Sequence, residues 1–450
     1  MGRLFGTDGI RGVVGDDLTT ALARLVGRAL VHTLIEKNGK APTVLIGMDT
    51  RLSSGMLADS VIEGICESGG NAVNLEVCST PAVAYLVTKH SYDAGVMISA
   101  SHNPWEYNGI KIFGGDGFKL SDALEEKIES LILDNDDLLV RAENSGTLTQ
   151  LFNGIDEYSE YILGSCDTRL DGMKIGIDCA NGSASVTAER IFTGLGAECV
   201  ILADKPDGMN INKGCGSTHL EGLKALVVEK GLDLGVAFDG DADRCLAIDE
   251  NGREIDGDYI LAILGSAMND SGTLKNNTIV GTVMSNLGLI NFCKASGIDF
   301  ISTKVGDRYV LETLNERHLS LGGEQSGHII LRELSTTGDG QLTAACLLSH
   351  VKKSGKSLAT LADVMKKCPQ YMVNVRADAD AKAAFKTDSV IKELICNGEK
   401  EMGDSGRILI RPSGTEPLIR VMTEGVDPDM AKRICEDLAK AIERRLGELK

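Results

Sequence analysis

The sequence predicts an α/β protein: three related α/β domains with mixed, mainly parallel sheets, followed by a smaller α+β domain. Apolar runs typical of buried strands alternate with amphipathic helical stretches along most of the chain. This order recurs three times, in units of roughly 100 residues. The length of 450 residues also suggests several domains, since one domain usually contains about 100–200 residues.

The first unit contains three predicted strands and two predicted helices. Leu57, Val61 and Ile65 recur at the spacing of one helix face. The polar stretch 143–147 follows the unit, so we place the first domain at residues 1–150. Its predicted elements are, in chain order, strand 43–49, a helix around 57–65, strand 71–77, helix 81–88 and strand 94–99.

The second and third units repeat this order, and we place them at residues 151–254 and 255–366. A hairpin turn at Asn251-Gly252 closes the second unit. The predicted strands are 174–178, 198–202 and 234–239 in the second unit, and 278–283, 300–303 and the segment around 322–331 in the third.

The last part of the chain, residues 367–450, shows a different pattern and predicts a small α+β domain. Met430, Ile434, Leu438 and Ile442 give its last helix one apolar face. Its predicted strands are 371–376, 407–411 and 418–422.

Charge and composition exclude several classes of function. The chain has 46 Lys and Arg against 65 Asp and Glu, a formal charge of −19, which argues against binding nucleic acid or an anionic membrane surface. No apolar run approaches the ~18 residues of a membrane span. The 12 cysteines include no C-x-x-C pair, which is typical of free thiols in a reducing compartment. We therefore expect a cytoplasmic protein.

The first unusual motif follows the predicted strand 234–238, where ligands of parallel sheets bind. Its carboxylates, Asp239, Asp241 and Asp243, would repel one another unless a cation lies among them. Oxygen ligands without His or Cys favour Mg²⁺. Two alternatives are a solvated acidic turn and an EF-hand loop completed by Glu250, although Arg244 occupies the position where that loop needs glycine.

The second motif, Ser99-Ala-Ser-His-Asn-Pro104, follows the strand that ends near Ile98. Small residues surround Ser101, and Asn103-Pro104 forces a turn. A serine that accepts and returns a phosphoryl group needs a metal to neutralise the phosphate oxygens, and the aspartate cluster would supply it. A polar turn without catalytic function is the alternative.

The third motif, residues 322–328, is rich in glycine and polar side chains. Glu324 and Ser326 are suited to bind sugar hydroxyls or an amine, and His328 to exchange protons near neutral pH. The alternative is a hairpin turn whose polar groups are satisfied internally.

The fourth motif, residues 411–417 together with Arg420, favours phosphate binding. Arg411, Ser413, Thr415 and the backbone around Gly414 combine a guanidinium with hydroxyl and N–H donors. A plain turn is the alternative.

Two further cations are candidates. Arg11 lies in the glycine-rich turn 5–12 as an anion contact, and Lys111 could exchange a proton if its pKa is lowered. Either could equally be an ordinary surface charge.

In this order, the four motifs resemble those of the α-D-phosphohexomutase superfamily, and the resemblance covers essentially the whole chain. It implies four domains around a central cleft, which contribute a phosphoserine loop, a metal loop, a sugar loop and a phosphate loop. Gln325 stands where phosphomannomutase/phosphoglucomutase relatives usually carry Met, whereas Trp105-Glu106 departs from the usual Tyr or Phe followed by Asp. The strings similar to the phosphoglucosamine mutase subfamily are residues 5–12, 210–219, 323–328 and 337–340.

The resemblance implies the reversible conversion of glucosamine 6-phosphate to glucosamine 1-phosphate. Phosphorylated Ser101 would give its phosphoryl group to the substrate, and the resulting glucosamine 1,6-bisphosphate would turn around and return the other phosphate. This bisphosphate, or that of glucose, would also serve as activator. Relatives feed UDP-N-acetylglucosamine synthesis for cell-wall precursors and are often homodimers.

The resemblance also implies a role for each candidate residue. Lys111 and His328 would transfer protons, with Arg11 as an electrostatic helper and Arg244 positioning the metal loop. The binding groups would be Asp239, Asp241, Asp243 and a phosphoserine oxygen of Ser101 for Mg²⁺, Glu324 and Ser326 for the sugar, and Arg411, Ser413, Gly414, Thr415 and Arg420 for the phosphate that does not react.

Three alternatives stay open at this point. A phosphomannomutase/phosphoglucomutase would share the motifs but prefer other hexoses. A phosphohydrolase with Asp239 as the nucleophile would not need Ser101. A sugar-phosphate sensor without catalytic activity would have no use for a metal cluster beside an exposed serine.

Overall fold

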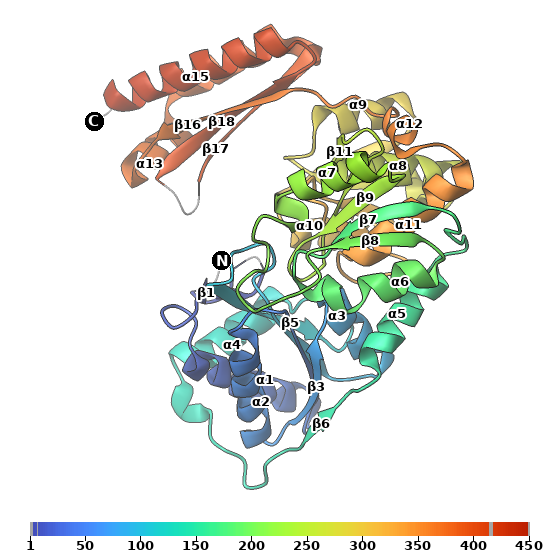
Figure 1. Cartoon of the computed structure of the whole chain (residues 1–450). Coiled ribbons are helices and arrows are strands. Elements are labelled where there is room, and N and C mark those ends of the chain that lie inside the picture. Colours follow the sequence, from blue (N-terminus) through green and yellow to red (C-terminus); the bar gives the residue numbers. More distant parts are fainter. Residues whose placement is uncertain (1–2, 7, 414–416, 449–450) are drawn as a thin grey trace. The chain divides into compact units, whose positions relative to one another are not determined.

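The computed structural model describes residues 3–6, 8–413 and 417–448 and contains four separate sheets (Figure 1). The chain divides into two compact units, Met1–Met284 with Ser296–Val364, and Ser285–Ala295 with Met365–Lys450. The sheets of the first unit are mixed, and that of the second is antiparallel, as the fold class predicts. The boundaries of the individual domains stay predictions.

The first sheet has a parallel centre and an antiparallel edge. Its strands, in spatial order, are β1 (Ile10–Val13), β5 (Tyr107–Gly114), β4 (Ala94–Ile98), β2 (Thr43–Met48), β3 (Asn71–Val77) and β6 (Leu148–Gln150). The helices of this part are α1 (Thr20–Asn38), α2 (Ser54–Glu67), α3 (Thr80–Lys89) and α4 (Asp122–Leu133).

Alternation along the strands decides which helix covers which face of this sheet. Ile46 and Val96 lie in one core with residues of α1, α2 and α4. Gly95 has the opposite orientation, and a Cβ built there would lie 2.8 Å from Val83 and 2.6 Å from Val87 of α3. Because glycine leaves this space, α3 packs directly on the sheet backbone. Figure 1 shows α1 and α2 on the side of the sheet away from α3.

The second and third sheets follow the same plan. The second contains β11 (Glu254–Ile255), β10 (Cys245–Asp249), β9 (Leu234–Phe238), β7 (Lys174–Asp178) and β8 (Glu198–Leu202), with helices α5 (Gly154–Ser165), α6 (Ala188–Gly194) and α7 (Glu221–Lys230). The third contains β13 (Asp299–Thr303), β12 (Thr278–Thr282), β14 (Leu321–Gly323) and β15 (Ile329–Leu331), with helices α8 (Gly257–Asp270), α10 (Asp307–Glu316), α11 (Gly340–Ser354) and α12 (Leu358–Ala362).

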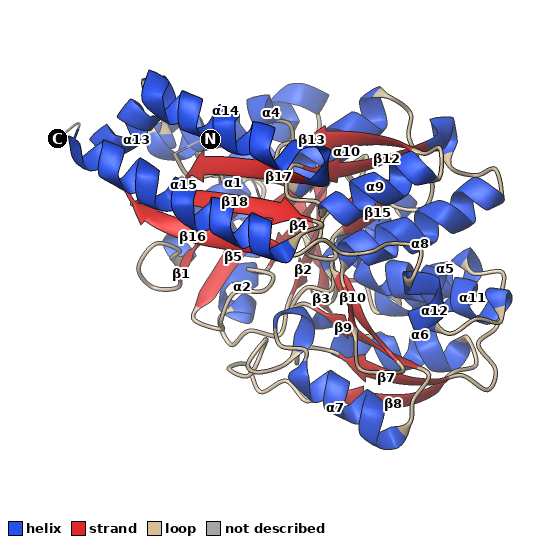
Figure 2. Ribbon diagram, turned by 90° about the horizontal axis from the view of Figure 1, so that it is seen from above, coloured by secondary structure: helices blue, strands red, loops and turns tan. Residues whose placement is uncertain are grey.

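The second compact unit is a three-stranded antiparallel sheet covered by helices (Figure 2). Ile434, Leu438 and Ile442 of its last helix are buried and Met430 packs against the same core, which confirms the predicted apolar face. The elements are α9 (Leu287–Ala295), β16 (Gln370–Arg376), α13 (Ala379–Thr387), α14 (Ser389–Met402), β17 (Gly406–Pro412), β18 (Leu418–Gly425) and α15 (Pro428–Glu448).

The structure also bears on the predictions made from composition about cysteines and membrane spans. All twelve cysteines are free thiols. Among the described residues, no helix is both long enough and apolar enough to cross a membrane.

Candidate active site

Ser101 lies in the loop after β4 and is almost completely buried, so the expectation of an exposed serine is wrong. Its exposed fraction is 1%, and its backbone has a φ of 53°, a left-handed conformation that side chains rarely adopt. Its hydroxyl donates a hydrogen bond of 2.6 Å to Oδ2 of Asp239. The conformation of this loop therefore directs the serine oxygen at the aspartate cluster.

Arg51 and Asn212 stabilise the Ser101 loop through hydrogen bonds to its backbone carbonyls. The Arg51 guanidinium donates to the carbonyl oxygens of Ser101 and Asn103, both at 2.9 Å, and it forms a fully buried ion pair with Asp49. The amide of Asn212 donates to the same two carbonyls, at 2.9 and 3.1 Å. Sequence analysis missed both residues as supports of the loop, because they act on backbone atoms far away in the sequence.

The loop after β9 carries the three aspartates and approaches the Ser101 loop closely. A Cβ at Gly240 would lie 2.5 Å from the carbonyl oxygen of Ser101, so this contact requires glycine. Asp239, Asp241 and Asp243 are 0, 0 and 4% exposed, so the hypothesis of a solvated acidic turn is wrong.

The EF-hand hypothesis is wrong as well. The aspartate loop joins two antiparallel strands, β9 and β10, instead of two helices. Glu250 accepts a hydrogen bond from the N–H of Ala359, at 3.1 Å, and is not among the clustered carboxylates.

The donor set of the aspartate loop fits a hard divalent cation. One oxygen from each aspartate lies within 4.8 Å of the others. Oδ1 of Asp241 and Oδ1 of Asp243 are buried without a hydrogen-bond partner. Burial and the charges of Asp243 and Asp241 raise the pKa of Asp239 well above its usual value, although Arg244 and the Ser101 hydroxyl oppose this. A divalent cation would add positive charge among the three carboxylates and accept their unpartnered oxygens as ligands.

Lys111 on β5 lies beside the aspartates and not on the surface, with 1% of its side chain exposed. Its Nζ is 2.7 Å from Oδ2 of Asp241 and 3.4 Å from Oδ2 of Asp243. Burial lowers its pKa, but Asp241, Asp8 and Asp243 outweigh burial and raise it well above the usual value. The lowered pKa that a base would need is therefore absent, and Lys111 is a fixed cation and hydrogen-bond donor.

His328 follows the sugar loop and lies between two carboxylates. Its Nδ1 is 3.6 Å from Asp243, and its Nε2 is 3.6 Å from Asp307. Burial lowers its pKa, whereas Asp243 and Asp307 raise it, to about 8. The N–H of Gly338 donates to Nε2 at 3.1 Å, so the neutral ring carries its proton on Nδ1, toward Asp243.

The predicted sugar loop is the turn between β14 and β15, and it adjoins the aspartate loop. The carbonyl of Gly327 accepts a hydrogen bond of 3.0 Å from the N–H of Cys245, the residue after Arg244. Glu324 and Ser326 are half-buried, and Oε1 of Glu324 accepts the N–H of Gly306 at 3.0 Å. The backbone of this loop thus forms the hairpin turn of the alternative interpretation. The side chains of Glu324 and Ser326 lie at this turn and are half-buried.

Arg11 and Arg244 are the remaining candidate cations of the first unit. Arg11, on β1, is ion-paired with Asp8. The backbone N–H of Arg244 donates to Oδ1 of Asp239 at 3.1 Å, and its guanidinium lies 3.9 Å from Asp243. Arg244 therefore contacts the aspartate loop through its backbone and its side chain.

The predicted phosphate loop joins β17 and β18 in the second unit. Arg411 and Arg420 are direct partners across these strands. Two like charges in register repel, and a bound anion would relieve this repulsion. Nζ of Lys382 donates to the carbonyl of Ser413 at 2.6 Å and adds a cation that sequence analysis missed. Gly414 and Thr415 lie outside the described residues.

Comparisons with known proteins decide the family. Models of the phosphoglucomutase/phosphomannomutase domains match this chain in order: domain I at residues 2–138, domain II at 156–252, domain III at 256–368 and the C-terminal domain at 372–441. The chain belongs to the phosphoglucomutase/phosphomannomutase family. Each of the four loops falls within a different one of these matches.

Individual members of this family are similar over nearly the full length. A phosphoglucosamine mutase of Acetivibrio thermocellus is 51% identical over 449 residues, 99% of this chain and 100% of the relative. A solved family protein of Burkholderia thailandensis has a similar fold, with a TM-score of 0.83, 23% identity, and coverage of 99% and 97% of the two chains. An Aspergillus fumigatus N-acetylphosphoglucosamine mutase, solved with GlcNAc-6P and magnesium, gives a TM-score of 0.67 at 17% identity, with 98% and 95% covered.

Proposed function

We propose that this chain interconverts glucosamine 6-phosphate and glucosamine 1-phosphate, and that each of its four predicted domains contributes one loop to the reaction. The observation that carries the proposal is the hydrogen bond of 2.6 Å between the buried Ser101 hydroxyl and Asp239 of the aspartate cluster. The 51% identity to a phosphoglucosamine mutase supports the choice of substrate.

In the first half of the reaction, the substrate hydroxyl attacks the phosphorus of phosphorylated Ser101. The new P–O bond forms to the sugar and the P–Oγ bond breaks, while the proton of the attacking hydroxyl passes, with His328 as the candidate carrier, to the leaving oxygen of Ser101. The bisphosphate formed then returns its other phosphoryl group to Ser101, so the enzyme ends as it began. Between the two transfers, Asp239 accepts the hydrogen bond of the Ser101 hydroxyl and fixes its oxygen.

The aspartates would hold Mg²⁺, which supplies charge neutralisation for the transferring phosphoryl oxygens. Lys111, as a buried cation beside Asp241, contributes a second positive charge and a donor. His328 is the candidate for moving a proton, because its pKa of about 8 is close to neutral pH. Arg11 would help to attract the anionic substrate.

The binding of the remaining groups divides between the two compact units. Glu324 and Ser326, on the first unit, are our candidates for the sugar. Arg411, Ser413 and Arg420, on the second, are our candidates for the phosphate that does not react, together with Gly414 and Thr415.

Intact-mass measurement after incubation with glucose 1,6-bisphosphate tests the proposal. We expect the wild type to gain the mass of one phosphoryl group. Ser101→Ala should gain none and lose turnover by roughly 10³-fold or more, since the nucleophile is absent. Ser60→Ala, which changes a half-buried helical serine whose hydroxyl donates to a carbonyl of its own helix, is the matched control and should behave as wild type.

Two results would contradict the proposal. Full turnover in Ser101→Ala would instead support a hydrolase with Asp239 as the nucleophile. Comparing kcat/KM for the phosphates of glucosamine, glucose and mannose tests the substrate, and better turnover of mannose 1-phosphate would reject glucosamine.

A further inference from the structure

A closed ring of alternating charges connects Lys111, the fixed cation beside the aspartates, with His328, the candidate for proton transfer. Lys111 lies 3.1 Å from Oδ2 of Asp8, and Lys119 is ion-paired with Asp8 and, at 2.5 Å, with Asp307. Asp307 lies 3.6 Å from His328. The ring runs from Asp243 through Lys111, Asp8, Lys119, Asp307 and His328 back to Asp243.

Lys119 occupies the position in this ring opposite to the aspartate cluster. It follows β5, and its side chain is 13% exposed. Neither Asp8 nor Asp307 belongs to the aspartate cluster. Burial raises the pKa of Asp8, but Lys111, Lys119 and Arg11 hold it well below the usual value. Lys119 and His328 likewise outweigh burial and lower the pKa of Asp307. Both carboxylates are therefore charged, and Lys119 is the cation that they share.

Removing the ammonium of Lys119 would leave two carboxylates without the cation that they share. Asp8 and Asp307 would then repel each other. Asp8 would be attracted more strongly to Lys111 and Arg11, and Asp307 to His328. Lys111 and His328 would be drawn away from the aspartate loop. The position of Lys119 thus determines how Lys111 and His328 face the reacting phosphoryl group.

We propose that Lys119 is a positioning residue for phosphoryl transfer: it fixes Asp8 and Asp307, and through them Lys111 and His328. This inference rests on the mutase activity proposed above. It assigns to Lys119 an effect on the rate of transfer, because Lys119 lies behind the residues that contact the aspartate loop and is not itself in contact with that loop.

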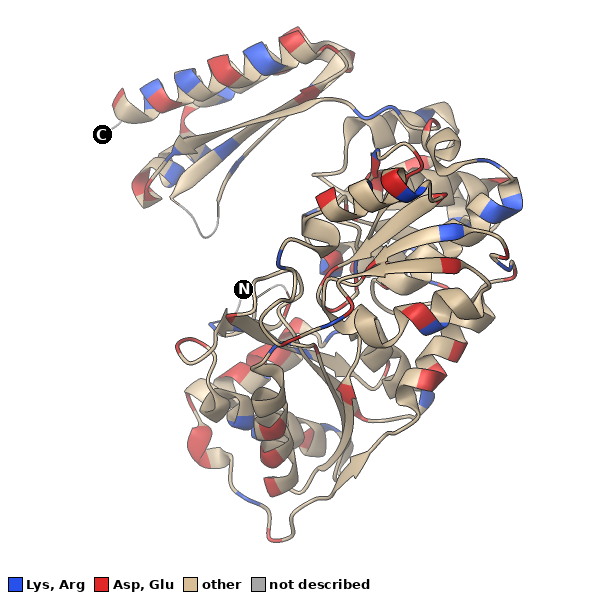
Figure 3. Ribbon diagram, viewed as in Figure 1, with Lys and Arg blue, Asp and Glu red and all other residues tan. Residues whose placement is uncertain are grey.

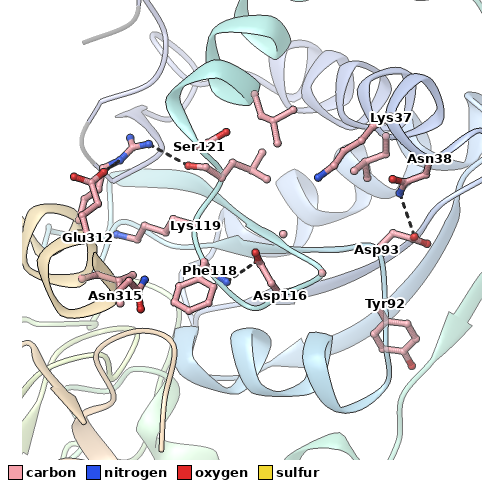
Figure 4. A pocket seen from close by; sticks show the side chains of 17 residues that line it. Lys37, Asn38, Tyr92, Asp93, Asp116, Phe118, Lys119, Ser121, Glu312 and Asn315 are labelled. Carbon is pink, nitrogen blue, oxygen red and sulfur yellow. Dashed lines mark hydrogen bonds and ion pairs between the residues drawn. The ribbon is translucent and has the colours of Figure 1, made fainter. Parts of the chain in front are cut away.

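The surroundings of Lys119 make a specific test possible. Lys119 lines a pocket of about 550 Å³, between the end of β5 and helix α10 (Figure 4). Truncation at this position would open the ring to the pocket. A small primary alkylamine from solution would then have access to the place of the lost ammonium group.

The experiment compares the turnover of Lys119→Ala, Lys119→Arg and wild type. We expect Lys119→Ala to lower kcat roughly 10- to 100-fold with KM changed less than threefold, as for other residues that orient a catalytic group. Lys119→Arg should retain most of kcat, and methylamine or ethylamine should restore Lys119→Ala at least fivefold. Lys37→Ala, which removes an exposed lysine of the same pocket outside the ring, should match wild type.

Each opposite result overturns the inference. A Lys119→Ala variant with kcat within twofold of wild type shows that Lys119 does not position the site. If Lys119→Ala does not fold, the arginine variant decides, because a folded Lys119→Arg with no measurable turnover would contradict an effect through charge. Loss of kcat that neither amine restores indicates a purely structural contribution. Absence of mutase turnover in the wild type would reject the proposed function and this inference together.

Discussion

At the scale of single residues, the site combines strained backbone with buried charge. Ser101 and Ala242 both have left-handed φ angles, 53° and 56°, in the two loops that meet at the site. Such conformations cost free energy and persist only where the surroundings enforce them, as Arg51 and Asn212 do for Ser101. Part of the free energy of folding therefore offsets the strain that places the Ser101 hydroxyl beside the Asp239 carboxylate.

The aspartate cluster makes a prediction about metal removal. Chelation by EDTA should abolish turnover, and added Mg²⁺ should restore it, because the carboxylates would repel one another without a cation. Asp243→Asn removes one ligand charge and should weaken Mg²⁺ binding at least about tenfold, as measured by calorimetric titration. Asp207→Asn, which changes an exposed turn aspartate, is the matched control. Unchanged affinity in Asp243→Asn would show that the metal binds elsewhere.

The sequence singled out Ser101 and the three aspartates, which the structure brings together, but not the side chains that surround them. Ser101 and the three aspartates stand out because each follows a buried strand in an unusual local string. Lys119 and Asp307 do not stand out in the sequence. Their role depends on folding, which brings Lys119 to Asp8 and Asp307 to His328 from distant segments. The raised pKa of Lys111 was missed for the same reason: its partners are encoded 130 and 132 residues away.

At the scale of elements, helices α1 and α2 are held together by an ion-pair network. Oxygens of Glu67 at the end of α2 accept hydrogen bonds from Arg24 and Arg28 of α1, the Nε contacts measuring 3.0 and 3.1 Å. Hydrogen bonding from Arg24 and Arg28, together with their charges, outweighs burial and lowers the pKa of Glu67 to about 2. The ionised carboxylate is thus favoured in the folded state.

This network predicts a pH-dependent contribution to stability. The unfolded state binds the Glu67 proton more readily, so the contribution is present above pH 4.5 and is lost as the pH falls toward 2. The side chain is 19% exposed, and solvent screening reduces the full effect to roughly 1–2 kcal/mol. Glu67→Gln should lower the Tm by a few degrees at pH 7, and the difference from wild type should shrink below pH 4.5. A difference that is constant between pH 7 and 3 would contradict this assignment.

The sequence predicted three strands and two helices of the first sheet domain, whereas β1, β5, β6, α1 and α4 were not predicted. Continuous apolar runs indicate strands such as β2, β4 and β9, because these are buried on both faces. The edge strands β1 and β6 are short and lack such a run, so no pattern predicts them. Helix α9 lies in the sequence of the third predicted domain but belongs to the same compact unit as residues 365–450. Asn286, just before α9, exchanges hydrogen bonds of 2.8 and 3.0 Å with the backbone of Cys368.

At the scale of the whole molecule, the net charge of −19 says little about the site. Acidic and basic side chains are interspersed along surface helices such as α15 (Figure 3). The lysines at the site do not lie on such a mixed surface. Lys111 and Lys119 are enclosed with carboxylates in one buried network. A global charge excludes classes of partner, whereas local placement decides what a site binds.

The division into two compact units leads to the last prediction. Ser101, the aspartates and the charge ring belong to the first unit, while Arg411 and Arg420 belong to the second. If the second unit binds the phosphate that does not react, its arginines contribute to substrate binding and not to the formation of phosphoserine.

Arg420→Ala should therefore raise KM for glucosamine 6-phosphate roughly tenfold or more, because a charge-assisted contact to a dianion contributes about 1.5–3 kcal/mol. Phosphorylation of Ser101 by a large excess of bisphosphate should still reach completion in the intact-mass measurement. Arg444→Ala, a change of an exposed arginine on the same unit, is the matched control and should leave KM unchanged. An Arg420→Ala variant with wild-type KM would place the phosphate elsewhere, whereas one that could no longer be phosphorylated would show that the second unit takes part in the chemistry itself.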